Sequence, residues 1–226
     1  GKSFVASNLA YIAAVHLPED VPVYAVDLDL DNGTLSMVLP PPEIEAKLRA
    51  RLASANVDYL NVADILDEGV VSGKLIFSFP FKVFACGGTQ MEGRLRLIPP
   101  YHELRKKSQM IKLRELDALR LREGLNSLID YLREKRGVAI LDGKQKSDLG
   151  INYDPLYRVA KERADVVLLV TEPPYLSFSD ITAQYTDIMD KLVIVVNKID
   201  ATYADKLMVL VSDAVRHEVP VFVVPL

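Results

Sequence analysis

The chain has 226 residues, an apolar fraction of 50% and a formal net charge of −4, which suits one sizeable α/β domain and gives no global argument for nucleic-acid binding. Its single cysteine, Cys86, excludes an internal disulfide and fits a reducing compartment. We find no signal peptide and no uncharged apolar run of the roughly 18 residues that a membrane helix needs. The expected location is therefore cytoplasmic.

The chain opens with Gly1-Lys2-Ser3, which matches the end of the phosphate-binding loop G-x-x-x-x-G-K-[ST]. In such a loop Lys2 would neutralise phosphate charge and the Ser3 hydroxyl would hold Mg²⁺, with the next helix directing its positive end at the anion. Apolar residues at helical spacing predict that helix over residues 2–17. The first strand and the first half of the loop would then precede residue 1. An ordinary core helix with a frayed start is the alternative.

Three carboxylates follow the apolar run of residues 21–27, which is typical of a buried parallel strand. Asp27, Asp29 and Asp31 alternate at its carboxyl end, where open α/β sheets bind ligands. Like charges this close repel unless a cation or water lies between them. We interpret them as functional, with a solvated acidic turn as the alternative.

The middle of the chain predicts two helices, over residues 43–54 and 61–71, and then two strands. Residues 74–85 alternate like a strand but contain Pro80, which favours an edge position. A second strand is expected over residues 94–98. Residues of about 74–93 would thus form a small hairpin-like addition.

A single long helix is predicted over residues 102–136, because apolar side chains recur on one side of it. The opposite side is basic, and its 105–122 part could bind DNA or an acidic partner. A solvated charged face is the alternative. The basic residues are Arg105, Lys106, Lys107, Lys112, Arg114, Arg120 and Arg122.

Residues 137–142 form an apolar strand ending in Asp142, as in a Walker B strand whose carboxylate holds Mg²⁺. The polar loop of residues 143–150 could sense a γ-phosphate or simply connect two elements. Helices and strands then alternate strictly to the end. The helices are expected over residues 154–163, 179–190 and 203–215, and the strands over 165–171, 192–197 and 219–224.

This alternation predicts a three-layer sandwich, with a mostly parallel central sheet flanked by helices. Right-handed crossovers would bring the candidate residues to one rim of that sheet. They are Gly1, Lys2, Ser3, Asp27, Asp29, Asp142, Asn197 and Lys198. Asn197-Lys198-Ile199-Asp200 also resembles the guanine-reading motif of GTPases, so GTP stays open beside ATP.

Taken together, the motifs resemble the ParA/MinD family of P-loop ATPases over nearly the whole chain. They are Gly1-Lys2-Ser3 followed by Asn8-Leu9-Ala10, the Asp27-x-Asp29 pair, the strand 139–142, the stretch 164–173 and Val195-Val196-Asn197-Lys198. The resemblance implies a single P-loop ATPase domain over residues 1–226.

The resemblance implies a slow ATPase that closes as a homodimer around two Mg-ATP and positions a cargo or meets an activator protein. By carry-over, Lys2 contacts the phosphates, Asp29 orients the attacking water, and Asp27 supports the Mg²⁺ shell held by Ser3 and Asp142. Gly1 completes the loop, and Asn197, next to Lys198, contacts adenine. Membrane association would be indirect.

The chain departs from the family pattern at Phe4 and in the loop of residues 143–147. The altered loop supports an alternative function, a scaffold that binds nucleotide weakly or not at all. A metal-cluster reductase of the same superfamily is disfavoured, because a cluster shared by a dimer needs two thiolates per chain.

Overall fold

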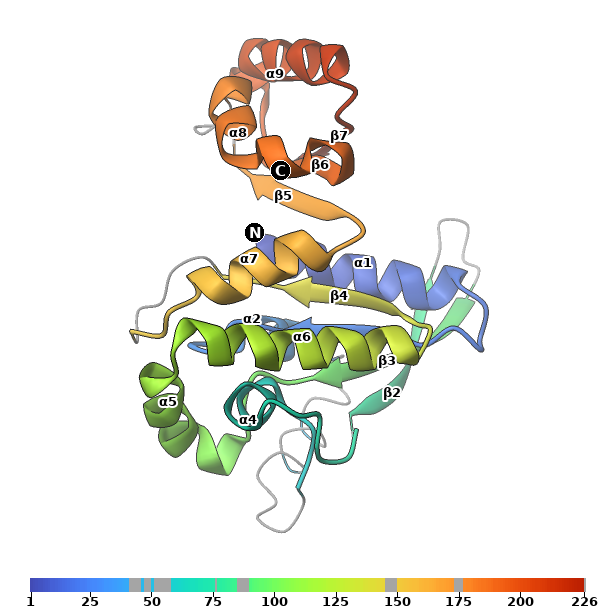
Figure 1. Cartoon of the computed structure of the whole chain (residues 1–226). Helices are drawn as coiled ribbons and strands as arrows, with labels where there is room; N and C mark the ends of the chain where they lie inside the picture. The colour runs from blue at the N-terminus through green and yellow to red at the C-terminus, as the bar shows by residue number, and fades with distance from the viewer. Residues whose placement is uncertain are drawn as a thin grey trace. The chain divides into compact units, whose positions relative to one another are not determined.

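The structure is a computed structural model that describes residues 1–40, 46, 50, 58–75, 77–84, 90–144, 150–172 and 177–225. The chain is α/β, and it divides into a larger unit of residues 3–160 and a smaller unit of residues 161–226 with Gly1 and Lys2. Each unit contains one sheet, with strand order β2-β3-β1-β4 in the larger and β5-β6-β7 in the smaller (Figure 1). The strands predicted as one sheet therefore pair as two, and a single P-loop domain over residues 1–226 stays a prediction.

The larger unit follows the predicted order of elements closely. Its elements are α1 (Lys2–His16), β1 (Val23–Asp27), α2 (Thr34–Val38), α4 (Val62–Glu68), β2 (Ser78–Phe84), β3 (Gln90–Ile98), η1 (Glu103–Arg105), α5 (Lys106–Glu115), α6 (Ala118–Glu134), β4 (Val138–Asp142) and α7 (Asp154–Arg163). Lys2 of α1 and residues 161–163 of α7 are counted with the smaller unit. The helix predicted over residues 43–54 lies outside the described residues, apart from Ala46 and Ala50.

The sheet of the larger unit is parallel except at one edge. β1 pairs in parallel with β3 and β4, and β2 pairs antiparallel with β3. β2 is the edge strand that Pro80 predicts, since proline cannot donate to a ladder. The hairpin is confirmed, but β3 is a parallel partner of β1, so only the first arm of the hairpin is an addition to the parallel sheet.

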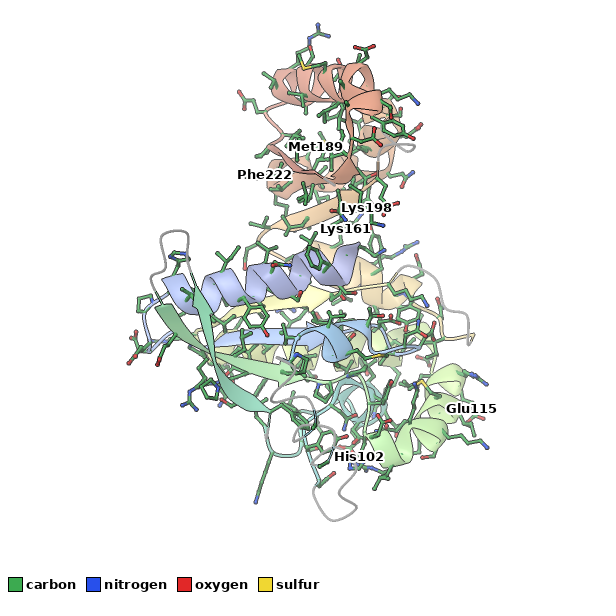
Figure 2. All side chains as sticks on the ribbon, turned by 180° about the vertical axis from the view of Figure 1, so that it is seen from behind. His102, Glu115, Lys161, Met189, Lys198 and Phe222 are labelled. Atoms are coloured by element: carbon green, nitrogen blue, oxygen red, sulfur yellow. The ribbon has the colours of Figure 1, made fainter. Side chains whose placement is uncertain are left out.

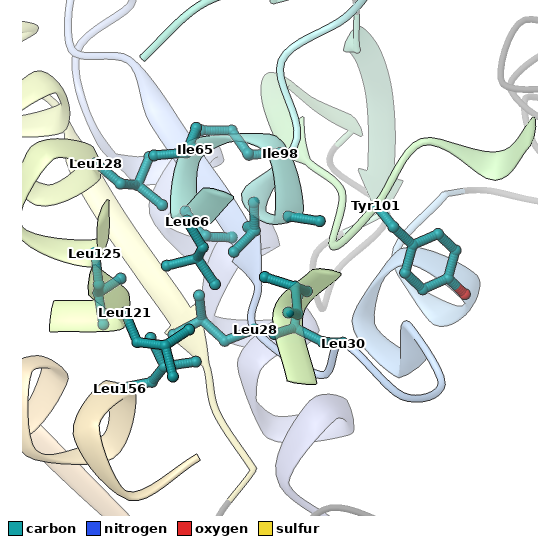
Figure 3. Packing of buried hydrophobic residues seen from close by; sticks show 14 of the residues in the cluster. Leu28, Leu30, Ile65, Leu66, Ile98, Tyr101, Leu121, Leu125, Leu128 and Leu156 are labelled. Carbon is teal, nitrogen blue, oxygen red and sulfur yellow. The ribbon is translucent and has the colours of Figure 1, made fainter. Parts of the chain in front are cut away.

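β1 has a core on each of its two faces, because successive side chains of a strand point to opposite sides. Val23 and Ala25 pack with Ala6 and Ala10 of α1. Tyr24 and Val26 belong to the other core, which α4, α5, α6 and α7 supply. Figure 3 shows part of that second core, a leucine-rich cluster between α4, α6 and the sheet. The sheet is thus covered on both faces, as expected for a parallel sheet.

The prediction of one helix over residues 102–136 is wrong. The segment forms η1, α5 and α6, and Leu116 between α5 and α6 is extended, with φ −70° and ψ 134°. Asp117 then caps α6, because its carboxylate accepts a hydrogen bond from the backbone N–H of Arg120 at 2.8 Å. An aspartate at an N-cap outweighs the apolar periodicity that continues through this point.

The smaller unit alternates helix and strand as predicted, but the α-helix expected over residues 179–190 ends at Tyr185 and is followed by a 3-10 helix over Thr186–Lys191. Its elements are β5 (Val167–Thr171), α8 (Phe178–Tyr185), η3 (Thr186–Lys191), β6 (Leu192–Ile199), η4 (Ala201–Tyr203), α9 (Ala204–Arg216) and β7 (Val221–Pro225). All pairings of its sheet are parallel, and β6 is the central, mostly buried strand. α8 begins one residue earlier than expected, because the hydroxyl of Ser177 caps it by accepting from the N–H of Asp180.

Candidate nucleotide site

Two carboxylates end adjacent parallel strands of the larger unit. Asp27 closes β1 and Asp142 closes β4, and the two residues are direct register partners. Both side chains are buried. The strand termini and the register therefore place two acidic groups side by side at the carboxyl edge of the sheet, where the sequence predicted them.

The Asp27 carboxylate holds the turn that follows β1. Its Oδ1 accepts from the N–H of Asp29 at 3.0 Å, and its Oδ2 accepts from the N–H of Ser36 at 2.7 Å. Burial raises the pKa of Asp27 to about 7; the hydrogen bonds from Ser36 and Asp29 oppose that rise, and the charge of Asp142 adds to it. A cation at this edge would stabilise the ionised form of Asp27, which burial disfavours. A carboxylate with such a shifted pKa is therefore a candidate for cation binding.

Asp29 is buried in the same turn and is tied to it. Its Oδ1 accepts from the N–H of Asn32 at 3.2 Å, and its Oδ2 accepts from the Thr34 hydroxyl at 2.8 Å. Gly33, at φ 67°, allows the chain to reverse here and to donate its N–H to the Asp29 carbonyl. The side chain proposed to orient water is therefore held in place before any ligand arrives.

Lys144, two residues after β4, joins this cluster and was not selected from the sequence. Its Nζ lies 2.9 Å from Asp31 Oδ2 and 3.9 Å from Asp29 Oδ1. Asp31 is only 1% exposed at its side chain, and its N–H donates to the Tyr153 hydroxyl at 3.2 Å. The signal in the sequence was a lysine two residues after the strand predicted to be Walker B. The rest of the predicted γ-phosphate loop, residues 145–149, lies outside the described residues.

A small cavity of about 30 Å³ lies beside Lys144. It is lined by Leu28, Gly143, Lys144, Tyr153, Leu156, Tyr157 and Ala160. It has room for water but not for a nucleotide, since pockets for such ligands measure several hundred Å³. We therefore do not assign it to the nucleotide.

The smaller unit holds the other half of the predicted residues. A Cβ at Gly1 would lie 3.9 Å from Glu172 Oε1, just past β5. Lys198 Nζ lies 2.9 Å from the same oxygen and is the main cause of a lowered Glu172 pKa, to which Lys2 contributes less. Gly1 thus lies close to Glu172, just past the carboxyl end of β5, and the role of Gly1 and Lys2 in a phosphate loop stays a prediction. Glu172 was not selected as a site residue.

Asn197 and Lys198 sit at a distortion of β6. Asn197 is buried, and Lys198 has φ 60°, in the left-handed region, where the register of β6 with β7 shifts (Figure 2 labels Lys198). A lysine in this conformation is uncommon and often marks a functional position. Asp200, the GTPase-like residue of this stretch, accepts hydrogen bonds from the N–H and the hydroxyl of Thr202 as the cap of η4.

These residues have the chemistry that magnesium nucleotides need. Mg²⁺ prefers one or two carboxylates together with waters and phosphate oxygens, and Asp27, Asp142 and the Ser3 hydroxyl are all oxygen donors. Within the described ranges no group of three or more His, Cys, Asp or Glu side chains could hold a metal ion by itself. A Mg²⁺ ion bound together with a nucleotide does not require such a group, because waters and phosphate oxygens supply the other ligands. Asp27, Asp29 and Asp142 come together in the larger unit, and Gly1, Lys2, Asn197 and Lys198 belong to the smaller one. A site that both units share stays a prediction.

The predicted basic face is largely engaged with α4 and its flanks. Arg105 pairs with Asp58 at 2.8 Å and Asp64 at 3.0 Å, and Lys112 pairs with Asp67 at 2.7 Å. Arg120 donates to the carbonyls of Asp67 and Glu68 at the end of α4. Lys106 donates to the Tyr101 hydroxyl. These contacts give Arg105, Lys106, Lys112 and Arg120 partners within the chain, and DNA binding through this face stays a prediction.

No protein-family model, curated protein or solved structure matches the chain. The ParA/MinD resemblance therefore depends on the motifs alone. None of the helices traced in the described segments is both long and apolar enough to cross a bilayer.

Proposed function

We propose that the chain is a ParA/MinD-like ATPase that binds and hydrolyses ATP and uses the nucleotide to switch between monomer and homodimer. The observation that supports this best is the buried carboxylate group at the ends of β1 and β4, where Asp27 and Asp142 are register partners. Burial raises the pKa of Asp27 to about 7, and the charge of Asp142 adds to that rise, so the ionised form of Asp27 is disfavoured at this edge. A bound cation would stabilise it.

Each side chain has a definite part in this proposal. Lys2 would neutralise the phosphates, and Ser3 and Asp142 would hold Mg²⁺, which would stabilise the negative charge of the phosphates. Asp29, fixed by Asn32 and Thr34, accepts from the attacking water and orients it. Asn197 contacts adenine. ATP is preferred to GTP, because the carboxylate of Asp200 accepts from Thr202 rather than from a guanine.

The partial exposure of β4 supports a larger P-loop sheet, in which a further strand would pair with β4. β4 is an edge strand among the described strands, and its Val138 is 37% exposed although the strand is apolar. Fully apolar parallel strands are normally covered on both sides. A further parallel strand beside β4 would cover it.

Calorimetry with Mg-ATP on the full-length protein tests nucleotide binding. We expect binding that Lys2→Ala abolishes and turnover that Asp29→Ala removes without preventing binding. Asp205→Asn, an exposed aspartate of α9, is the control for a change of charge. Absence of heat with Mg-ATP in the unmodified chain would refute the proposal.

Light scattering tests the switch. We expect the solution mass of the Asp29→Ala variant to double with Mg-ATP and to stay that of a monomer with Mg-ADP. A mass that does not depend on the nucleotide would refute the switch but not the ATPase. A cargo or activator protein would be sought with the ATP-bound dimer as bait, in a cytoplasmic setting.

The alternative is a scaffold without catalysis. It is favoured by Lys144, because an ammonium group already lies 2.9 Å from Asp31 and 3.9 Å from Asp29, where an ATPase needs a water and a metal nearby. Robust turnover that depends on Asp29 would exclude the scaffold.

A further inference from the structure

Lys144 and Asp31 form a buried ion pair that the proposed chemistry does not use. The Asp31 side chain is 1% exposed and the Lys144 side chain 22%, and their charged atoms are 2.9 Å apart. A carboxylate this buried is stable only with a partner of opposite charge. Lys144 supplies that charge from beyond β4 to the turn after β1, across 113 residues of sequence.

The same ammonium group also acts on the proposed metal edge. Lys144 Nζ is 3.9 Å from Asp29 Oδ1, and the Asp29 N–H donates to Asp27, the register partner of Asp142. The ammonium thus pairs with a residue that is hydrogen-bonded to Asp27, beside the carboxylate of Asp142 that would hold the cation. A fixed positive charge near a largely buried site opposes a divalent cation.

We propose that Lys144 is the resident counter-cation of Asp31 and Asp29, and that it opposes divalent-cation binding at Asp142, so that the charge at position 144 sets the metal affinity. This inference rests on the proposed function, because it takes the Asp142 site from it. Lys144 is a positioning residue: it acts on the metal through the carboxylates.

The two members of the ion pair then have opposite effects. Removing the ammonium with Lys144→Gln makes the surroundings of Asp31 and Asp29 more negative, which favours a cation. Removing the carboxylate with Asp31→Asn makes them less negative and keeps the ammonium 3.9 Å from Asp29 Oδ1, which disfavours a cation. A pair with a merely structural role would behave differently, since breaking it from either side would loosen the site and weaken metal binding in both variants.

The test is the affinity of the full chain for Mn²⁺ alone, measured by electron paramagnetic resonance without nucleotide. We expect Lys144→Gln to tighten Mn²⁺ binding by about tenfold or more and Asp31→Asn to weaken it. Lys144→Arg keeps the charge and should bind as the unmodified chain does. Lys112→Gln is the matched control, because it makes the same change of net charge at a lysine paired with Asp67 on α4.

A second comparison uses a double variant in which both charges of the ion pair are removed. In the Asp31→Asn background, adding Lys144→Gln leaves neither member charged, so folding is protected, and the double variant should bind Mn²⁺ more tightly than Asp31→Asn alone. Circular dichroism reports the folding of each variant.

The outcomes separate the two proposals. If Asp142→Asn abolishes binding while Lys144→Gln binds no more tightly than the unmodified chain, the role of Lys144 is overturned and the metal site stands. If Asp142→Asn binds Mn²⁺ as the unmodified chain does, the metal site fails, and the proposed function with it. If neither the unmodified chain nor Lys144→Gln binds Mn²⁺, the role of Lys144 is also overturned.

Discussion

Asp27→Asn should change how the stability of the chain depends on pH. The pKa of Asp27 rises from 3.8 to about 7 on folding, chiefly through burial. Between these values the folded state keeps a proton that the unfolded state releases, so the free energy of unfolding falls as pH rises through this window. Because each tenfold change in proton affinity is worth about 1.4 kcal/mol, the full effect is about 4 kcal/mol.

The variant removes this titration but also removes one acceptor. An Asn amide offers one oxygen where Asp27 accepts from two backbone N–H groups, of Asp29 and Ser36, and the loss of one bond should cost about 1–3 kcal/mol at every pH. Asp27→Asn should therefore be less stable than the unmodified chain near pH 4 and more stable near pH 8.

Urea unfolding followed by circular dichroism, between pH 4 and 8 with EDTA and no nucleotide, measures the difference between the two chains. Titrating groups that do not interact with Asp27 cancel in that difference, whereas Asp142, whose charge acts on Asp27, does not. Asp205→Asn is the control. Parallel stability curves for the two chains, with no crossing, would refute the assignment of the raised pKa to Asp27.

Two further predictions concern packing in the larger unit. Gly124→Ala should destabilise the chain by about 1–3 kcal/mol, because a Cβ there would lie 2.6 Å from Leu66 Cα, where α6 crosses α4. Gly143→Ala is the control, because its Cβ would meet nothing within 4 Å. Equal urea midpoints for the two variants would contradict the prediction. Gln109→Ala should cost about 1–3 kcal/mol in the same assay, since it strands the buried N–H of His102, which donates to Gln109 Oε1 at 2.9 Å, and removes a donor to Asp64. Ser108→Ala, at an exposed neighbour, should change stability by less than about 0.5 kcal/mol, and a loss equal to that of Gln109→Ala would contradict the role of the buried amide.

The sequence by itself determined the succession of elements and the ends of the strands. Hydrophobic periodicity and turn residues act over a few neighbours, so they predict α1, β1, β4 and the alternation of the smaller unit. For the same reason, Asp27 and Asp142 could be placed at strand ends, and their meeting followed from the parallel register.

Only the tertiary structure decided the properties that depend on distant partners. The basic face looked available in the sequence, but Arg105 and Lys112 pair with carboxylates on and beside α4, more than 40 residues away in the chain. Lys144 became part of the site because Asp31, remote in sequence, is buried beside it. The proton affinity of Asp27 likewise follows from burial, and burial is set by packing between elements rather than by the residues next to it in the chain.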